Sequence, residues 1–354
     1  MNYFDAFYRT VLHPGDTSYR AGFQQLQAAG IPFIRFMVMP FWPNEARAFV
    51  RNPNLLFQLL DQFVQDAQTY NIGLIGSVFW NYQALPAVMG EPVGAWGDPN
   101  SKTTAFAKSF SQQLAARYRQ SPTIWAWEFA NEMNAYDDLP TGYEYYLVDT
   151  SEGKPAAYTT ADNLTSEQML FAYTTFANAI HAGDPLRLVE PGYALPRNNA
   201  YQLRTGRSAA EDTVAQFYTV EAEDNAPGDL SSVHIYPESV NQAYDARFAD
   251  QSVTAPEFIT VAANAGQAAC KPMFIGEFGT PDDGSDGSSQ ESFLDFQALL
   301  NSFVASSAPL AAAWVFDFTY QETHDGNNNM TFRNSRADRL NLITQANQSL
   351  GASH

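Results

Sequence analysis

The sequence predicts an α/β protein folded as a single (β/α)8 TIM barrel, and three observations support this fold class. Eight short apolar runs alternate with longer amphipathic segments, which is the pattern that repeated strand–helix units produce. The 354 residues suffice for one such barrel with inserted loops. No change in composition and no linker divides the chain. We therefore expect one domain over residues 1–354, with long loops after the fourth and eighth strands.

The expected strands are short runs rich in β-branched and aromatic residues. The first begins almost at the start of the chain. In chain order they are Asn2–Phe7, Ile34–Val38, Gly73–Phe79, Thr123–Phe129, Leu186–Val189, Ser231–Tyr236, Met273–Glu277 and Ala311–Phe316.

Amphipathic segments between these strands are expected to be helices. Thr165 to Gln168 and Ser288 to Glu291 have the pattern of capping boxes, which mark where helices begin. The expected helices cover Leu56–Ala67, Ser101–Arg119, Met169–His181, Phe293–Val304 and Ser335–Ser349.

Two polar segments are too long to be simple connections between strand and helix. Asn134–Leu164 follows the fourth strand, and Gln321–Arg333 follows the eighth. Barrel enzymes carry their functional loops after the strands, so both segments are candidates for substrate contact. Gly284–Ser289 is rich in Gly, Ser and Asp, and we expect it to be mobile.

Composition excludes several classes of partner. The formal net charge of −19 argues against nucleic acid and anionic membranes, because phosphate groups require a basic surface. No apolar run reaches the roughly 18 residues of a membrane span. The single cysteine, Cys270, cannot form a disulfide within the chain. We expect a monomer that binds neither nucleic acid nor membrane.

Histidine content disfavours a metal-dependent hydrolase. The chain has five histidines, and none of them forms a His-x-His or His-Glu-x-x-His group. We therefore expect no metal and no cofactor.

Two apolar strands each end in a carboxylate. The run from Ile124 to Phe129 leads into Asn131-Glu132, and the run from Pro272 to Ile275 leads into Gly276-Glu277. The tips of the fourth and seventh strands face each other across a barrel mouth, so Glu132 and Glu277 can lie on either side of a bound ligand. A lone Glu at a strand tip would more simply pair with a surface Arg, but two in matching positions point to catalysis.

A carboxylate pair of this kind is what the cleavage of a glycosidic bond requires. One group protonates the leaving oxygen, and the other attacks the anomeric carbon or activates water. A separation of about 5–5.5 Å gives retention of configuration, whereas roughly 6.5–9.5 Å gives inversion.

With these motifs in place, the chain resembles glycoside hydrolase family 5, a family of retaining (β/α)8 glycosidases that includes cellulases and mannanases. The family's Asn-Glu on strand four and Glu on strand seven correspond to Asn131-Glu132 and Glu277. Its conserved residues on other strands also have counterparts in the expected order. They are Arg35 on strand two, His234 and Tyr236 on strand six, and Trp314 on strand eight.

The resemblance implies roles for these residues. Glu277 would be the nucleophile, oriented by Arg35 and Tyr236, and Glu132 would be the acid/base. We expect partial burial and the charge on Glu277 to raise the pKa of Glu132. Asn131 would bond the sugar 2-hydroxyl, and His234 would hold Glu132 or a sugar hydroxyl. Trp314 would form a platform beneath the sugar.

The chain departs from the family at the end of strand three. Many members have a His there, whereas this chain has Trp80-Asn81, so its substrate pocket must be built differently. Candidate substrate-binding residues, chosen as aromatic or amide side chains after strands, are Trp80, Asn81, Tyr3, Trp42, Trp96, Asn134 and His324.

The resulting hypothesis is a retaining glycosidase that cleaves a β-linked glycan, of the β-1,4-glucan or β-mannan type, through a covalent glycosyl-enzyme. An exo-acting β-glycosidase and a carbohydrate-binding barrel without catalysis remain alternatives. The expected partner is an oligo- or polysaccharide. Family resemblance implies a secreted or periplasmic protein, although the chain opens without the basic segment of a signal peptide, which leaves a cytoplasmic location open.

Overall fold

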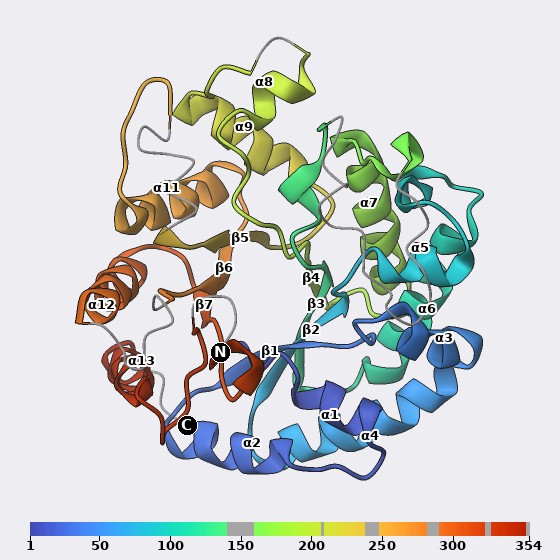
Figure 1. Cartoon of the computed structure of the whole chain (residues 1–354), viewed down its shortest axis with the longest axis horizontal. Helices are drawn as coiled ribbons and strands as arrows, with labels where there is room; N and C mark the ends of the chain where they lie inside the picture. Colours follow the sequence, from blue (N-terminus) through green and yellow to red (C-terminus); the bar gives the residue numbers. More distant parts are fainter. Residues whose placement is uncertain (140–158, 207–208, 238–247, 282–289, 323–326, 352–354) are drawn as a thin grey trace.

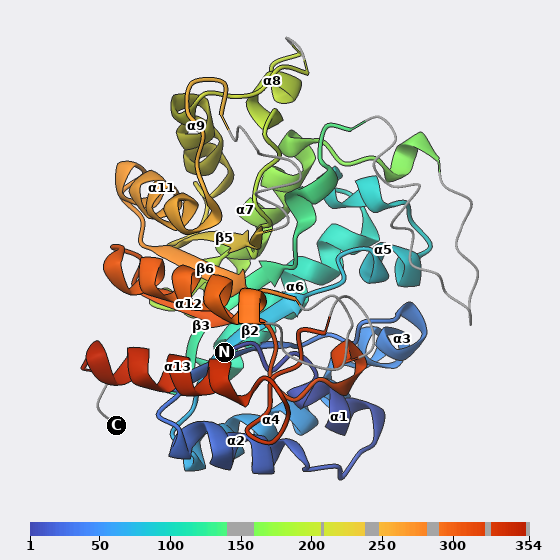
Figure 2. The same cartoon turned by 60° about the vertical axis from the view of Figure 1, so that its left-hand side comes forward.

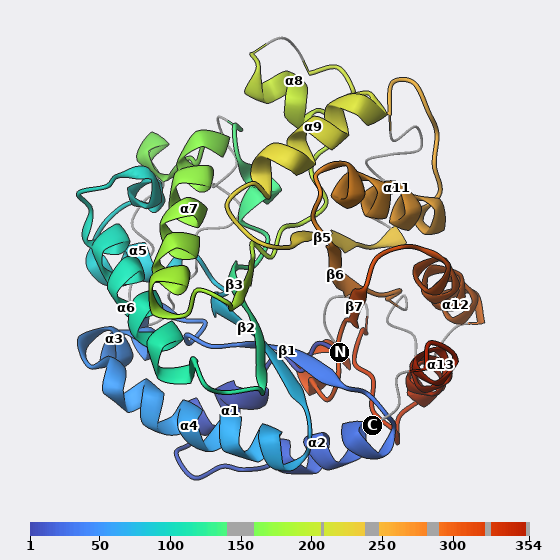
Figure 3. The same cartoon turned by 180° about the vertical axis from the view of Figure 1, so that it is seen from behind.

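A computed structural model describes residues 1–139, 159–206, 209–237, 248–281, 290–322 and 327–351. Its strands lie in the middle of the molecule with helices arranged around them, as the views from opposite sides show (Figures 1 and 3). The strands form two parallel sheets, one in the order β1-β2-β3-β4 and one in the order β5-β6-β7. The first sheet contains β1 (Phe33–Met37), β2 (Gly73–Phe79), β3 (Ile124–Ala130) and β4 (Leu188–Glu190), and the second contains β5 (Ser231–Ile235), β6 (Met273–Phe278) and β7 (Leu310–Ala313).

Backbone hydrogen bonds join the two sheets at both of their junctions. Asp229 and Leu230, just before β5, both donate to the carbonyl of Val189 in β4, at 2.8 and 3.2 Å. At the other junction Asn2 donates to Ala313 at 2.9 Å and pairs with Arg35 of β1 in a parallel bridge. The N-terminal segment therefore occupies the place of the first barrel strand, and it lies between β7 and β1 in Figures 1 and 3. The (β/α)8 prediction is confirmed.

The prediction of a strand over Asn2–Phe7 is wrong in its extent. Only the segment around Asn2 is extended, and helix α1 (Ala6–Leu12) begins four residues later. Phe7 and Val11 of α1 are both buried, and their i,i+4 spacing is helical. This periodicity outweighs the aromatic content that suggested a strand.

The other predicted strands are found within one to three residues of their expected ends, and β2 matches its prediction. Strand β7 is shorter than expected because it ends at Ala313. After Ala313, the N–H of Trp314 donates to the carbonyl of Phe278 in β6, and Phe316 forms an isolated parallel β-bridge with Met330.

The predicted helices are present in α4, α6, α7, α12 and α13. Thr165 caps α7 in a capping box with Gln168, as predicted. The second proposed capping box falls partly, and Gly284–Ser289 wholly, outside the described residues. The helices are α1 (Ala6–Leu12), α2 (Tyr19–Ala28), α3 (Pro43–Arg51), α4 (Pro53–Thr69), α5 (Ala84–Met89), α6 (Lys102–Tyr118), α7 (Ser166–Gly183), α8 (Ala200–Arg204), α9 (Val214–Asp224), α11 (Ala255–Ala268), α12 (Gln290–Ala305) and α13 (Ala337–Ser349).

Within the described residues, short 3-10 helices lie in the loops: η1 (Val93–Gly97), η2 (Met133–Tyr136), η4 (Thr160–Asp162) and η5 (Thr319–Glu322). Helices α12 and α13 lie beside each other on the side of the barrel that Figure 2 brings forward. Among the described helices, none is both long and apolar enough to cross a membrane.

Side chains inside the barrel form two layers of opposite character. The lower layer is an apolar cluster that includes Phe33, Ile75 and Ala126. Because side chains two residues apart point to the same face of a strand, the next layer up is made by Arg35, Ser77 and Glu128, all fully buried. The strands thus bring polar and charged groups to the carboxyl end of the barrel over an apolar base.

Candidate active site

Arg35 lies at the centre of the polar layer and is fully buried. A guanidinium has five N–H donors, and each one here has an acceptor. The acceptors are both carboxylate oxygens of Glu128, Oδ1 of Asn2 at 2.9 Å, Oδ1 of Asn131 at 2.8 Å and Oε1 of Glu277 at 2.7 Å. The guanidinium also lies over the Trp80 ring, 4.1 Å from its centroid, so its plane is fixed as well.

Glu277 is the last residue but one of β6, and its carboxylate is held at both oxygens. Oε1 accepts from Arg35, and Oε2 accepts from the hydroxyl of Tyr236 at 2.7 Å. Burial and the charge of Glu277 raise the pKa of Tyr236 well above its ordinary value, so this tyrosine stays a neutral donor. Burial alone would lower the pKa of Arg35, but the charges of Glu128 and Glu277 outweigh it and raise that pKa. The group beside Glu277 therefore remains a cation.

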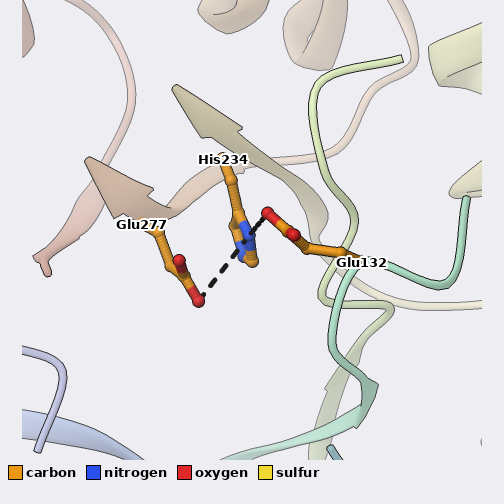
Figure 4. A group of neighbouring side chains, drawn as sticks. All are labelled: Glu132, His234 and Glu277. Carbon is orange, nitrogen blue, oxygen red and sulfur yellow. Dashed lines mark hydrogen bonds and ion pairs between the residues drawn. The ribbon is translucent and has the colours of Figure 1, made fainter. Parts of the chain in front are cut away.

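Glu132 follows β3 in a left-handed backbone conformation, with φ of 51°. Its N–H donates to the carbonyl of Gly192 at 2.7 Å, which fixes this turn. Its carboxylate meets Nδ1 of His234 at 2.9 Å, and the same nitrogen lies 3.7 Å from Glu277. The three side chains converge from β5, β6 and the end of β3 (Figure 4). One oxygen of Glu132, one of Glu277 and one nitrogen of His234 all lie within 4.8 Å of one another.

The expectation of a raised pKa for Glu132 is wrong. The surrounding protein by itself would raise this pKa, but the hydrogen bond and charge of His234, together with the charge of Arg35, lower it more. The pKa of Glu132 consequently lies below its ordinary value in the unliganded protein.

Among the residues that the structure describes, Glu132, His234 and Glu277 are the group whose atoms are spaced as metal ligands could be. Arg35 already places a positive charge beside this group, because it donates a hydrogen bond to Glu277 at 2.7 Å. A fixed guanidinium disfavours a second cation at the same carboxylate. The arrangement suits a carbohydrate hydroxyl or an electrophilic carbon better than a metal ion.

These groups lie at the base of a cavity of about 850 Å³. Of the sequence-predicted residues, the ones that line it are Trp42, Trp80, Asn131, Glu132, Tyr236, Glu277 and Trp314. Trp80 and Trp314 lie with their ring centroids 5.8 Å apart, and Nε1 of Trp314 donates to Gln321 at 2.8 Å. The catalytic candidates and the three tryptophans are thus brought together in one cavity.

Four predicted substrate-binding residues lie elsewhere. Trp96 is buried against Phe79 and Phe129 and donates to a backbone carbonyl, so it is a core residue. Tyr3 is also fully buried.

The two amide side chains among these four hold loops in place. Asn81 donates to the carbonyl of Phe41 and accepts from the amide of Gln83. Asn134 exchanges two hydrogen bonds with the backbone of Ala194, at 2.9 and 2.8 Å. His324 lies outside the described residues.

The sequence reasoning missed residues of two kinds. Glu128 and Glu190, within strands, belong to the buried layer beneath the cavity, and the signal that could have indicated them is an acidic residue inside an apolar run. The second kind lines the outer cavity and comes from segments with no motif. It comprises Phe4, Asp5, Tyr8, Arg9, Leu12, Phe41, Phe318 and Tyr320. Gln321 and Asn328 also line the cavity, and they lie in the segment Gln321–Arg333 that was a candidate for substrate contact.

Comparison with known proteins places this site in context. Residues 8–304 match the family model described as Cellulase (glycosyl hydrolase family 5). Among curated protein sequences, none is significantly similar to the chain.

Solved structures share the fold at low sequence identity. An endo-1,4-β-mannanase from Rhizomucor miehei is 16% identical, with 98% of this chain and 93% of that chain covered and a TM-score of 0.66. A GH5_18 protein from Streptomyces cattleya, solved with GlcNAc, is 15% identical with a TM-score of 0.70, over 99% of this chain and 79% of that one. An exo-β-1,4-mannosidase from an Opitutaceae bacterium is 14% identical with a TM-score of 0.62, over 99% and 60%.

Proposed function

The chain belongs to glycosyl hydrolase family 5, and from that premise we propose that it is a retaining glycosidase with Glu277 as nucleophile and Glu132 as acid/base. The observation that carries this proposal is the carboxylate pair at the base of the cavity. Oxygens of Glu132 and Glu277 lie within 4.8 Å of each other. This distance is closer to the roughly 5–5.5 Å separation of retaining enzymes than to the roughly 6.5–9.5 Å that makes room for water in inverting enzymes.

The contacts of Glu277 support its role as the attacking group. Arg35 and Tyr236 each hold one oxygen, which orients the carboxylate. When an oxygen of Glu277 bonds to the anomeric carbon, its negative charge is consumed. In the second step water attacks the anomeric carbon, and the negative charge returns to Glu277. The guanidinium and the phenol are already placed to stabilise that charge.

Glu132 suits the complementary role. It borders the open cavity, with 38% of its side chain accessible, so it can reach a glycosidic oxygen. In the first step it gives its proton to the leaving group, and in the second step it takes a proton from water. Because its pKa is lowered in the unliganded protein, the protonated form is favoured at acidic pH.

The preferred substrate is proposed to be a β-1,4-linked mannoside, with β-1,4-glucan as the second candidate. Structural neighbours support this order, since they include endo-1,4-β-mannanases and mannosidases. One further neighbour, from Streptomyces cattleya, was solved with Manβ1-4GlcNAc. Within the chain, Trp80 and Trp314 line the same cavity as Glu277, and Trp314, the less buried of the two, offers an apolar face to a pyranose ring.

The roles of the two glutamates are tested by replacing each one. Glu277→Ala should reduce hydrolysis of an aryl β-mannoside by several orders of magnitude, and azide should restore turnover with inverted product configuration. Glu132→Ala should keep partial activity on a substrate with a good leaving group, and azide should then give a product of retained configuration. Wild-type rates in Glu277→Ala would contradict the assignment.

Substrate preference is tested by comparing initial rates on β-mannan, manno-oligosaccharides, carboxymethyl cellulose and mixed-linkage glucan. We expect the highest kcat/KM on the mannan series. A higher value on cellulose derivatives would reverse the order, and binding of sugars without any hydrolysis would show a carbohydrate-binding barrel instead.

A further inference from the structure

Beneath the proposed catalytic pair, β3 and β4 place two carboxyl groups side by side in the barrel interior. Glu128 and Glu190 are direct partners in the parallel pairing of these strands. Both are fully buried, and each carboxyl group shifts the pKa of the other. Two ionised carboxylates cannot share a water-free site without strong repulsion, so a pair of this kind normally holds a proton.

The hydrogen bonds around the pair indicate where the proton lies. Both oxygens of Glu128 accept from Arg35, whose five donors are all taken. For Glu190, Oε2 accepts from the N–H of Gly192 at 2.7 Å. Oε1 of Glu190 is buried and meets no N–H or O–H donor within the described part of the chain. The hydrogen bond that Glu190 can still form is one in which a protonated Oε1 donates to Glu128.

Charge in this layer leads to the same assignment. Arg35 contacts the carboxylates of Glu128 and Glu277, and Glu190 lies beside Glu128 on the neighbouring strand. Titratable groups around Glu190 include Glu128 of β3, Arg35 of β1, Tyr173 of α7 and Asp229, whose carboxylate accepts from the N–H of Val189 at 2.9 Å. Burial and the charge of Glu128 raise the pKa of Glu190 well above its ordinary value. Burial would likewise raise the pKa of Glu128, but the charge and hydrogen bonds of Arg35 lower it.

We propose that Glu190 is protonated and donates a hydrogen bond to the Glu128 carboxylate. The pair then has a single negative charge, and Arg35 remains available to Glu277. Glu190 is then a positioning residue, and this role rests on the proposed function of Glu277. An ionised Glu190 would add a second negative charge beside Arg35 and compete with Glu277 for the guanidinium. A neutral Glu190 instead steadies Glu128, which anchors two of the five guanidinium donors.

The protonation of Glu190 is tested by comparing the wild type with Glu190→Gln. Glutamine has the same size, is always neutral and can donate a hydrogen bond to Glu128. Above the ordinary glutamate pKa of about 4.3, wild-type folding requires uptake of a proton, whereas folding of the variant does not. The ratio of the unfolding constants, wild type over variant, should therefore rise by up to about tenfold per pH unit until the folded-state pKa is reached. Glu167→Gln, on the exposed surface of α7, is the matched control.

A second readout is infrared difference spectroscopy at neutral pH. The wild type minus Glu190→Gln should contain the carbonyl stretch of a neutral carboxylic acid, shifted in D2O. A ratio of unfolding constants that does not change with pH, or a difference spectrum with only carboxylate bands, would overturn the proposal.

The positioning role is tested by kinetics on an aryl β-glycoside. Glu190→Gln should keep kcat within about threefold of wild type, whereas Glu190→Leu, which cannot donate to Glu128, should lower kcat by about tenfold or more with KM little changed. Full activity of Glu190→Leu would overturn this role. If the wild type hydrolysed no glycoside, the proposed function would fail while the unfolding and infrared results would still decide the protonation of Glu190.

Discussion

At the residue scale, His234 controls the protonation of Glu132. Its Nδ1 lies 2.9 Å from the Glu132 carboxylate, and this contact, with the charges of His234 and Arg35, lowers the pKa of Glu132 against the effect of burial. The basic limb of a kcat/KM profile reports the pKa of the essential acid in the free enzyme. We therefore expect that limb to lie at acidic pH in the wild type.

His234→Leu removes both the hydrogen bond and the charge. Burial then dominates, so the pKa of Glu132 should rise and the basic limb should move to higher pH by about one unit, equivalent to about 1.4 kcal/mol. His234→Gln retains a neutral donor and should give a smaller shift in the same direction. A basic limb that stays in place, or that moves to lower pH, would show that His234 does not set this pKa.

The residue scale also shows how far sequence reasoning reaches. Asn131, Glu132 and Glu277 could be placed because each follows an apolar strand, and strand direction brings these ends together. The sign of the Glu132 pKa shift could not be predicted, because it depends on which atom of His234 faces the carboxylate. Glu190 carried no motif, and its importance appears only when the pairing of β3 with β4 places it beside Glu128.

At the scale of elements, the turn after β4 holds the turn after β3. Gly192 accepts from the N–H of Glu132 and donates to Glu190, both at 2.7 Å. Its own φ is +74°, and an added Cβ would lie 1.9 Å from the carbonyl oxygen of Ala130. A side chain at this position is therefore excluded by both the backbone conformation and the contact.

Gly192→Ala should destabilise the protein by roughly 2–4 kcal/mol, combining the cost of a left-handed alanine with the displacement of β3. It should also reduce kcat, because the backbone of Glu132 moves with its partner. Chemical denaturation and steady-state kinetics measure the two effects. Gly90→Ala is the control: it has a similar φ of +70° with nothing within 4 Å, so it should cost about 1 kcal/mol and leave kcat unchanged. Equal losses in the two variants would contradict the role of the Ala130 contact.

Element prediction from sequence succeeded where periodicity was long and failed where it was short. The run of Gly73–Phe79 is a strand as predicted, because seven apolar or small residues between turns allow little else. The first element was misassigned because the six residues Asn2–Phe7, with three aromatic rings, fit a strand as well as a helix. Trp96 and Asn134 follow strands as functional residues do, yet one packs in the core and the other fastens η2 to Ala194.

At the scale of the whole molecule, closure of the barrel builds the outer cavity from the two ends of the chain. Tyr8 and Leu12 come from α1, Trp42 follows β1, and Phe318 and Tyr320 follow β7. The junction of Asn2 with Ala313 and Arg35 brings these segments together. Apart from Trp42, which was a candidate because it is an aromatic residue after a strand, no local pattern in the sequence could reveal this lining, because its members are separated by up to about 300 residues and become neighbours only when the barrel closes.

This lining leads to a prediction about substrate length. Trp42 and Tyr320 are exposed by 40% and 53%, unlike most large apolar side chains of the protein, and they lie in the same cavity as the carboxylates. Exposed aromatic faces in a cavity suit further sugar units beyond the one that is cleaved. Trp42→Ala should lower kcat/KM for a long manno-oligosaccharide by about tenfold, which corresponds to about 1.4 kcal/mol of lost contact. An aryl monoglycoside, which occupies the site beside Glu277 alone, should be hydrolysed at the wild-type rate.

Tyr320→Ala tests the wall of the cavity that follows β7, as Trp42→Ala tests the wall that follows β1. Leu186→Ala is the surface control, because this side chain is 90% exposed and does not line the cavity. If both walls bind the same glycan, the two aromatic variants should each lose activity that grows with oligosaccharide length, and their effects should add, because Trp42 and Tyr320 lie on different segments. A loss that is equal for the monoglycoside and the oligosaccharide would mean that the rings act through the geometry of the catalytic pair instead of through contact with distant sugars. Dependence on length is therefore the property that assigns these rings to substrate binding.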